Sequence, residues 1–246
     1  MIDESADYIA VDKPPHLLVH PSKPGNPPTL LDGLEHLLAF EVVNGARLSI
    51  ITRLDRDTSG VVLVTKNHGA ARKFSMAMER RQFQKRYLAL VYGWPDEDNF
   101  TIDAPLLRLG EVAPTRIWLK RVVHPHGAPS QTHFTVQKRF NVAGGRFAVV
   151  EAAPITGRMH QIRVHLQHAG HSVVGDKIYG PSEDWYLQFI ENGWIDEMAA
   201  ALHLPRHALH ATSLALPVSG LQWKAPLPND MAEFIGRSKS PTTTGE

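Results

Sequence analysis

The chain has 246 residues, of which 43% are hydrophobic and 21% charged, and its formal net charge is +1. This composition is that of a folded globular protein, and the bulk charge gives no sign of a nucleic-acid binder. The absence of cysteine excludes disulfides, thiolate metal sites, iron–sulfur clusters and cysteine nucleophiles. The N-terminus lacks a basic start followed by an apolar stretch, and no apolar run approaches the roughly 18 residues of a membrane span. We therefore expect a cytoplasmic protein.

Strand and helix patterns are interspersed in the first half of the chain. Short apolar, β-branched runs at 48–51 and 61–64 predict strands, with the polar segment TRLDRDTSG between them. Apolar residues at positions i, i+4, i+7 and i+8 predict a helix over about 69–82. Residues 87–91 then have the composition of a buried strand.

The second half continues the same irregular order. Its predicted elements are strands at 132–136, 147–149 and 209–216 and helices at 158–169 and 182–202. The helix over 158–169 has an apolar stripe beginning at Met159, and Gly170 is placed to close it in a left-handed conformation. This order favours an α+β fold built on a mixed or mostly antiparallel sheet. We expect one domain over 1–235 and a disordered tail at 236–246.

Positive charge is concentrated in one segment. Seven cations lie between Lys66 and Arg86, against the single acid Glu79. Such a segment can form a local phosphate-attracting face on a nearly neutral protein. A solvated helix face rich in arginine explains the pattern equally well.

Several motifs suggest other chemistry but lack a necessary part. The 14 histidines include no metal-binding pattern of the HExxH kind. The segment 170–177 has the glycine spacing of a phosphate loop, but Asp176 stands where the lysine is required. Residues 57–60 resemble the loop of an aspartic protease only weakly, and no second copy supplies the partner carboxylate.

The segment 53–60, RLDRDTSG, places charged and hydroxyl side chains between two apolar strands. A loop between buried strands is where a rigid scaffold presents reactive groups. A turn in which Asp and Ser bond the backbone would account for Asp57 and Ser59, but not for two arginines that flank Asp55. We therefore treat this segment, with Asp55 at its centre, as a candidate functional loop.

The segment 156–163, TGRMHQIR, places two arginines in the first turns of the predicted helix, where the helix dipole disfavours cations. Such arginines should meet an anion, which is a carboxylate, an RNA phosphate, or both. We expect His160, Arg163 and Gln167 to share a polar face and point into a cleft. Tyr87, at the head of a predicted strand, is the third candidate feature.

These segments together resemble the RluA family of pseudouridine synthases. The matching segments, in family order over about 210 residues, are DKPP (12–15) with VHP (19–21), RLDRDTSGVVLVTK (53–66), QKRYLALVYG (84–93), PITGRMHQIRVHLQHAGHSVVGDKIYG (154–180) and LHATSLALP (209–217). The resemblance implies an enzyme that isomerises specific uridines in structured tRNA or rRNA, through an aspartate nucleophile and a flipped nucleotide. It implies no cofactor and no metal.

The resemblance also implies roles for individual residues. Asp55 matches the catalytic carboxylate, Tyr87 the tyrosine that packs on the target base, and Arg163 the basic residue that pairs with that carboxylate. Arg53 matches the arginine thought to fill the gap left by the extruded nucleotide. The residues expected to contact RNA are Arg53, Arg56, Arg80, Arg81, Arg158 and His160. Attack at C6 of the uracil, attack at C1′ of the ribose and a glycal route all stay open.

Two positions depart from the family pattern. Thr52 replaces the usual histidine before Arg-Leu-Asp, which could change how the loop is braced. His16 replaces the glycine that commonly follows Lys-Pro-Pro, in a turn where glycine is usually needed. The sequence also begins almost directly at the first motif, so we expect no N-terminal S4 RNA-binding module of the kind that many relatives carry.

RNA recognition is therefore expected from the catalytic domain itself, and reversing the charge of Arg80 and Arg81 should weaken it and flatten its salt dependence. We expect a monomer with no obligate protein partner. The alternative is a protein of the same fold that binds or folds RNA with little or no turnover. A metal-dependent nuclease is a more distant alternative, since the sequence shows no carboxylate cluster.

Overall fold

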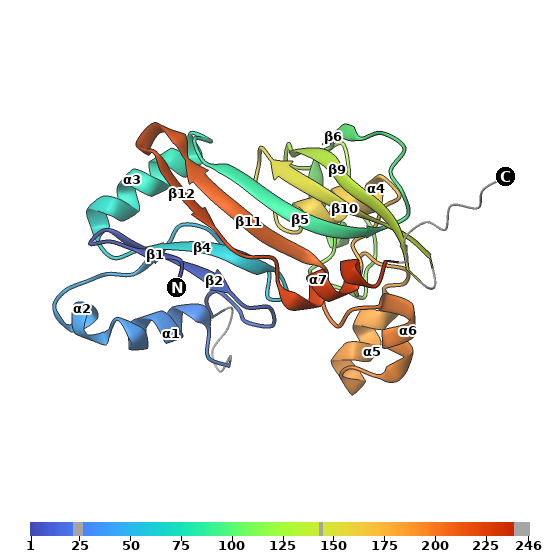
Figure 1. Cartoon of the computed structure of the whole chain (residues 1–246), viewed down its shortest axis with the longest axis horizontal. Helices are drawn as coiled ribbons and strands as arrows, with labels where there is room; N and C mark the ends of the chain where they lie inside the picture. Colours follow the sequence, from blue (N-terminus) through green and yellow to red (C-terminus); the bar gives the residue numbers. More distant parts are fainter. Residues whose placement is uncertain (22–26, 143–144, 239–246) are drawn as a thin grey trace. The chain divides into compact units, whose positions relative to one another are not determined.

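The computed structural model describes residues 1–21, 27–142 and 145–238 (Figure 1). The chain divides into two compact units. Unit 1 contains Met1–Lys85 and His210–Pro226, and unit 2 contains Arg86–Leu209 and the chain from Leu227 onward. The single domain expected over 1–235 stays a prediction. Most of the tail expected at 236–246 lies outside the described residues.

Unit 1 is built on a mixed sheet. Its strands run in the order β1 (Asp3–Glu4), β2 (Tyr8–Lys13), β4 (Ser59–Thr65) and β11 (Leu209–Leu216), with β3 (Ser49–Ile50) paired to β4 and β12 (Leu221–Lys224) paired to β11. The pairing of β11 with β4 is parallel, whereas the other pairs are antiparallel. The helices of this unit are α1 (Leu30–Leu37), α2 (Ala39–Val43) and α3 (His68–Glu79), and a short 3-10 turn, η2 (Pro217–Ser219), joins β11 to β12.

The sheet of unit 1 is buried on both faces, which explains its continuous apolar strands. Successive side chains of a strand point to opposite faces. One set packs with Leu34 and Leu38 around α1 and comprises Ile9, Val11, Val62 and Val64. The other set packs with Phe74 of α3 and Trp223 of β12 and comprises Tyr8, Ala10, Val61 and Leu63.

Local capping fixes where two of these helices begin. Thr29 precedes α1 and forms a reciprocal capping box with Asp32. Asn67 precedes α3, and its side-chain oxygen accepts a hydrogen bond from the Ala70 N–H at 2.8 Å. The helix predicted over 69–82 is thereby confirmed, with a start set by Asn67.

Unit 2 contains an antiparallel sheet in the order β5 (Gln84–Tyr92), β10 (Gly145–Pro154), β9 (Gln131–Val142) and β6 (Asn99–Asp103). A separate pair consists of β7 (Leu106–Arg108) and β8 (Arg121–Val123), and a 3-10 turn, η1 (Leu109–Glu111), follows β7. The helices are α4 (Gln161–His168), α5 (Asp184–Asn192), α6 (Asp196–Leu202) and α7 (Asn229–Gly236). The α+β class and the mixed sheet expected from the sequence are confirmed.

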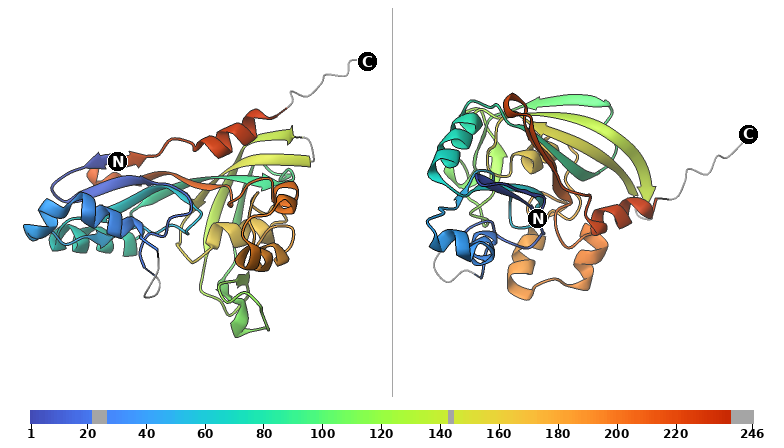
Figure 2. Two further views of the ribbon diagram at one scale, coloured as in Figure 1. Left: turned by 90° about the horizontal axis from the view of Figure 1, so that it is seen from below. Right: turned by 60° about the vertical axis from the view of Figure 1, so that its left-hand side comes forward.

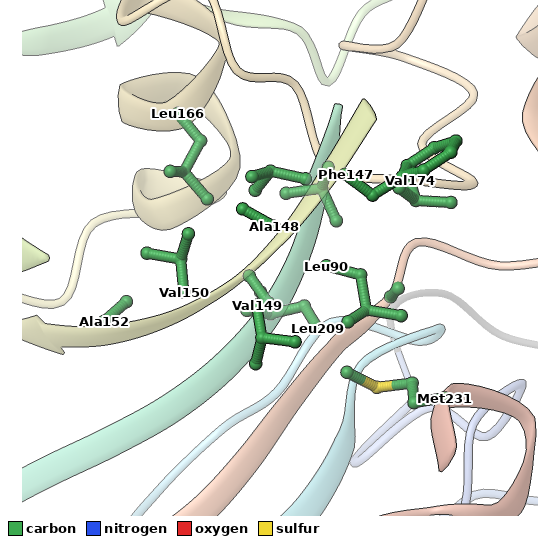
Figure 3. Packing of buried hydrophobic residues seen from close by; sticks show 14 of the residues in the cluster. Leu90, Phe147, Ala148, Val149, Val150, Ala152, Leu166, Val174, Leu209 and Met231 are labelled. Carbon is green, nitrogen blue, oxygen red and sulfur yellow. The ribbon is translucent and has the colours of Figure 1, made fainter. Parts of the chain in front are cut away.

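The main core of unit 2 lies between its sheet and the helices α4 and α7. Figure 3 shows Leu90 of β5 and Val149 of β10 close to Leu209 and Met231, with Leu166 of α4 on the other side of β10. Buried aliphatic side chains of this kind supply most of the folding free energy, at roughly 25 cal/mol per Å² of apolar surface. The core therefore holds β5 and α4, which carry Tyr87 and Arg163, on one rigid body.

One predicted element is divided in the structure. The segment 182–202 forms two helices, α5 and α6, instead of one (Figure 2). Gly193 ends α5 with a positive φ of 73°, a conformation that glycine adopts at little cost. The apolar periodicity continues across this glycine, so periodicity alone does not reveal the break.

Candidate active site

The loop that carries Asp55 lies in unit 1, between β3 and β4. It turns tightly, because the Asp55 carbonyl accepts a hydrogen bond from the Thr58 N–H at 3.1 Å. At the start of the loop, the Thr52 hydroxyl accepts a hydrogen bond from the Leu63 N–H of β4 at 2.9 Å. Thr52 thus braces the loop against the strand, although the residue departs from the family pattern. Asp55 itself is half-buried and Arg53 is exposed.

Lys13 fixes the other side of this loop. Its ammonium is fully buried and donates hydrogen bonds to the carbonyl oxygens of Pro14 at 2.7 Å, Leu17 at 2.8 Å and Arg56 at 3.0 Å. Three carbonyl acceptors match the three donors of an ammonium group and replace the water that burial removes. Lys13 therefore ties the turn after β2 to the residue next to Asp55.

Replacing Lys13 by methionine is expected to destabilise unit 1 and to loosen the Asp55 loop. The change removes the donor that the carbonyls of Pro14, Leu17 and Arg56 share. An acceptor left without a partner costs about 1–3 kcal/mol, and less where water can reach it. Chemical denaturation with tryptophan fluorescence measures the loss. Lys224→Met, which removes an exposed cation of the same unit, is the control and should change stability by less than about 0.5 kcal/mol. Equal stability of the two variants would contradict the role of Lys13.

A second contact braces the loop at Asp57. One oxygen of its carboxylate accepts a hydrogen bond from Arg56 Nε at 3.1 Å and lies 3.1 Å from His16 Nδ1. His16 has a φ of +64°, so the expectation that this turn favours glycine is confirmed. Because the His16 side chain is 51% exposed, the pair contributes little to stability and serves mainly to orient the turn.

Tyr87 lies in unit 2, on β5. The strand begins three residues earlier than the sequence predicts, and Tyr87 is paired with Ala152 of β10. The tyrosine is half-buried and packs against the main core of unit 2. A ring fixed on a core strand is a rigid surface on which a planar group can stack.

The helix that carries Arg163 begins later than its sequence predicts. α4 starts at Gln161 instead of residue 158, because His160 has a left-handed backbone with φ of 58°. Arg158 therefore precedes the helix, and Arg163 is its third residue. Met159, the predicted start of the apolar stripe, is 41% exposed.

Gln161 holds the turn before α4 in place. Its side-chain oxygen accepts hydrogen bonds from the Arg158 N–H at 2.9 Å and the Thr156 hydroxyl at 2.7 Å. Its side-chain nitrogen donates to the Gln131 carbonyl at 2.9 Å and the Thr132 hydroxyl at 3.0 Å. This buried amide satisfies the backbone of the turn and joins it to β9.

The prediction that His160, Arg163 and Gln167 share a polar face is wrong. Residues 161–166 are all buried, whereas Gln167 is exposed, so Gln167 does not share the environment of His160 and Arg163. The helix is enclosed on more than one side, since its buried residues belong to two core clusters, one with the main sheet and one with β7 and β8. A single apolar stripe therefore underestimates how much of α4 is buried.

Arg163 meets a carboxylate, as its position suggested, and that carboxylate is Asp176. Two parallel bonds join them, Nε to Oδ2 at 2.6 Å and one terminal nitrogen to Oδ1 at 2.8 Å. The side chains are 5% and 0% exposed. Asp176 Oδ1 also accepts the N–H groups of Ile178 and Tyr179, each at 3.0 Å.

The pair keeps Asp176 charged in spite of its burial. Burial by itself would raise the pKa of this carboxyl, but Arg163 and the two N–H donors outweigh that effect and lower the pKa below its usual value. The guanidinium of Arg163 is thus fixed in one plane by a two-point contact. Asp176 was considered in the sequence only as a misfit to a phosphate loop, and its role was missed. The available signal was an acid inside the apolar segment 173–179, since a buried acid requires a partner.

Tyr179 completes the surroundings of Arg163. The guanidinium carbon lies 4.9 Å from the centre of the tyrosine ring. The tyrosine hydroxyl is 2.8 Å from His160 Nδ1 and accepts the Arg121 N–H at 2.8 Å. Nearby His207 is buried, and burial followed by the positive charge of Arg163 lowers its pKa well below the usual value, so that this imidazole is neutral.

The sequence-predicted site residues are distributed over both units. Unit 1 carries Asp55 with the exposed cations Arg53, Arg56, Arg80 and Arg81. Unit 2 carries Tyr87, Arg163, the buried His160 and the exposed Arg158, whose Nε donates to the Pro129 carbonyl at 3.2 Å. The pairing of Asp55 with Arg163 stays a prediction, as do the RNA-binding roles.

The described residues contain no group of three or more His, Cys, Asp or Glu side chains able to hold a metal ion. His165, one of the histidines considered above, is a buried core residue whose ring lies 2.9 Å from the Thr132 hydroxyl. Across the same residues, we find no helix with the length and apolar character needed to cross a membrane.

Comparison with known proteins gives consistent matches. A family model described as RNA pseudouridylate synthase matches residues 7–168. Ribosomal large subunit pseudouridine synthase D from a strain of Escherichia coli is 35% identical over 244 residues, which cover 96% of this chain and 69% of that protein. The protein of the same name from Yersinia pestis is 35% identical over 98% of this chain and 71% of its own length. Among solved structures, Human RNA Pseudouridylate Synthase Domain Containing 4 has the same fold, with a TM-score of 0.72 at 22% identity over 98% of this chain and 94% of that one.

Proposed function

Because the chain belongs to the RNA pseudouridylate synthase family and is an RNA pseudouridine synthase, we propose that it acts on uridines of large-subunit ribosomal RNA with Asp55 as its nucleophile. The observation that carries the proposal is the match to relatives named for that substrate, over more than two thirds of their length. Transfer RNA, which the sequence left open, becomes the alternative substrate.

The surroundings of Asp55 suit a nucleophile. Isomerising uridine breaks a stable N-glycosidic bond and joins the same sugar carbon to C5, which calls for a positioned nucleophile and no redox chemistry. The turn closed by Thr58, together with Thr52 and Lys13, supports the Asp55 backbone from both sides. A carboxylate held on such a loop needs little reorganisation when it attacks.

We assign supporting roles to three further residues. Tyr87, fixed on β5, would stack on the target base, a contact worth roughly 1–3 kcal/mol for an unstacked base. Arg53, which is exposed beside the nucleophile, would occupy the space of the flipped nucleotide, since a planar guanidinium both stacks and hydrogen-bonds. Arg163, oriented by Asp176, would be the basic residue that pairs with the catalytic carboxylate.

Pseudouridine mapping of total RNA from the organism that encodes the chain tests the proposal. A strain carrying Asp55→Ala is compared with wild type, and the protein level is verified in both. We expect one or a few sites in large-subunit ribosomal RNA to lose the modification. If only sites in transfer RNA lost the modification, transfer RNA would be the substrate, and the proposed reaction at Asp55 would stand. No lost site at normal protein level would contradict a catalytic role and favour the RNA-binding alternative.

A cytoplasmic location and a monomeric state stay predictions. Size-exclusion chromatography with light scattering measures the second directly.

A further inference from the structure

A groove in unit 1 runs between α3 and the turn η2 that follows β11. It encloses about 490 Å³. Its lining includes the apolar side chains of Met76, Ala77 and Leu216 and the polar residues Gln82 and Ser219. The groove is separate from the loop of Asp55, since none of the loop residues 51–58 lines it.

The rim of this groove is cationic. The groove is lined by three exposed residues, Arg72, Lys73 and Arg80. No acidic side chain lines the groove, and within the described part of the chain these three cations take part in no ion pair. Glu79, the one acid of the basic segment, is exposed but outside the groove lining.

Arg72 and Lys73 lie on α3, and Arg80 is the capping residue directly after its last turn. Successive residues of a helix are about 100° apart, so positions 72, 73 and 80 fall within roughly 100° of one another, with Met76 between them. Residues 72 and 80 are separated by about 12 Å along the helix axis, at a rise of about 1.5 Å per residue. Because the charges on one nucleic-acid strand recur every roughly 3.4 Å along a duplex, this spacing spans several phosphates.

The end of α3 adds a fourth cation in an unusual backbone conformation. Arg81 has a φ of +55°, and the Arg81 and Gln82 N–H groups bond the carbonyls of Met78 and Ala77 at 3.0 and 2.9 Å. This is the Schellman closure, in which glycine is the usual residue at the position of Arg81. Glycine would adopt this conformation without strain. Arginine adopts it less favourably, but it adds a positive charge at this position. A cation near a helix C-terminus is also favoured by the helix dipole, which explains part of this choice.

We propose that the α3–η2 groove, with Arg72, Lys73, Arg80 and Arg81, binds the phosphate backbone of the RNA away from the modified nucleotide. This inference rests on the proposed function, which supplies the RNA. A regularly charged polymer fits a row of unpaired cations better than a folded acidic protein does, because backbone phosphates present charge at every step along the strand. The groove thus extends recognition beyond the nucleotide that reacts.

The test compares wild type with the variant Arg72→Gln/Lys73→Gln/Arg80→Gln. The probe is an in vitro transcript of large-subunit ribosomal RNA, and its affinity is measured by filter retention over a series of salt concentrations. We expect the variant to bind about 10- to 100-fold more weakly at low salt. The slope of log K against log salt should become shallower by about 2, because each lost phosphate contact removes roughly 0.7–0.9. Steady-state kinetics should show a larger rise in KM than fall in kcat.

A control variant with the same change in net charge, made away from the groove, distinguishes the loss of the groove cations from a general loss of positive charge. Lys138→Gln/Lys224→Gln/Arg237→Gln removes three exposed cations of other elements and should leave the slope within experimental error of wild type. An equal change of slope in both variants, or no change in the groove variant, would overturn the groove proposal while the synthase activity stands. Failure of wild type itself to bind the transcript would instead count against the proposed ribosomal substrate and, with it, this inference.

Arg81→Gly provides an independent reading of the same idea. Glycine removes the backbone strain that arginine has in the left-handed conformation, so Tm should rise by about 2–4 °C in a chain of this size. RNA affinity should fall about threefold or more, because a cation is lost. A variant that is more stable and binds RNA as tightly as wild type would overturn the role of Arg81.

Discussion

Replacing Asp55 by asparagine is expected to stop pseudouridine formation while the protein stays folded and binds RNA. Asparagine keeps the shape of the side chain but cannot act as an anionic nucleophile. The turn should persist, because it is the backbone carbonyl of residue 55 that accepts the Thr58 N–H. We expect the turnover of an RNA transcript to fall on the order of 10³-fold or more, as is usual when a nucleophile is removed. Release of label from 5-tritiated uridine measures the rate.

Asp57→Asn is the matched control for this experiment. It removes a carboxylate of the same loop, two residues away, and weakens the contacts with Arg56 and His16. Both partners are about half exposed, so the loss should change stability by less than about 1 kcal/mol and the rate by less than about tenfold. Comparable losses in the two variants would indicate that loop structure, and not the chemistry of Asp55, had been removed.

The sequence predicts much of the fold because the decisive patterns are local. The strand at 59–65 and the helix at 68–79 follow from a continuous β-branched run and from helical spacing. The left-handed turn at His16 follows from a position where glycine is expected, and the structure gives a φ of +64° there. Each of these features depends on residues that are close together in the chain.

The two errors at α4 concern features that depend on distant residues. The start of α4 is set by Gln161, whose side chain reaches across to Thr132 and the Gln131 carbonyl. No pattern within 158–169 contains that information. In the same way, the burial of α4 on several sides follows from the position of β7 and β8, which a helical stripe cannot reveal.

The supporting residues of the site were missed for the same reason. Lys13 acts through Arg56, which is 43 positions away, and Asp176 acts through Arg163, which is 13 positions away. Lysine and aspartate are usually exposed, so the residue type alone gives no reason to expect that Lys13 or Asp176 is fully buried. The sequence motifs identified the segments that contain them, whereas only the structure identifies what each side chain contacts.

Replacing Asp176 by alanine is expected to cause the largest loss of stability among the site variants. The change leaves the guanidinium of Arg163 buried without its carboxylate, which typically costs about 3–5 kcal/mol. Asp176→Asn keeps the volume and one acceptor oxygen and should cost less. Chemical denaturation of the full chain measures both, with Asp230→Asn as the control. Asp230 forms a similar two-point contact with the buried Arg206 of the same unit.

The control separates stability from positioning. Both Asp176→Asn and Asp230→Asn weaken an arginine pair, but only the first releases the arginine proposed to act near the reacting nucleotide. At a temperature where both variants are folded, we therefore expect kcat to fall at least about tenfold for Asp176→Asn and to stay near wild type for Asp230→Asn. Equal activities would show that Asp176 serves folding alone.

The pH dependence of stability gives a second, independent signature of the same pair. The pKa of Asp176 is lower in the folded protein than the value of about 3.9 expected after unfolding. Its contribution is therefore present above about pH 4 and is lost as the pH falls toward the folded-state pKa, because the unfolded chain then binds the additional proton. The free energy of unfolding of wild type should accordingly fall more steeply below pH 4 than that of Asp176→Asn, which has no proton to bind at this position. Parallel curves would mean that the carboxylate of Asp176 is not held ionised by Arg163, and the orientation of Arg163 would then need another cause.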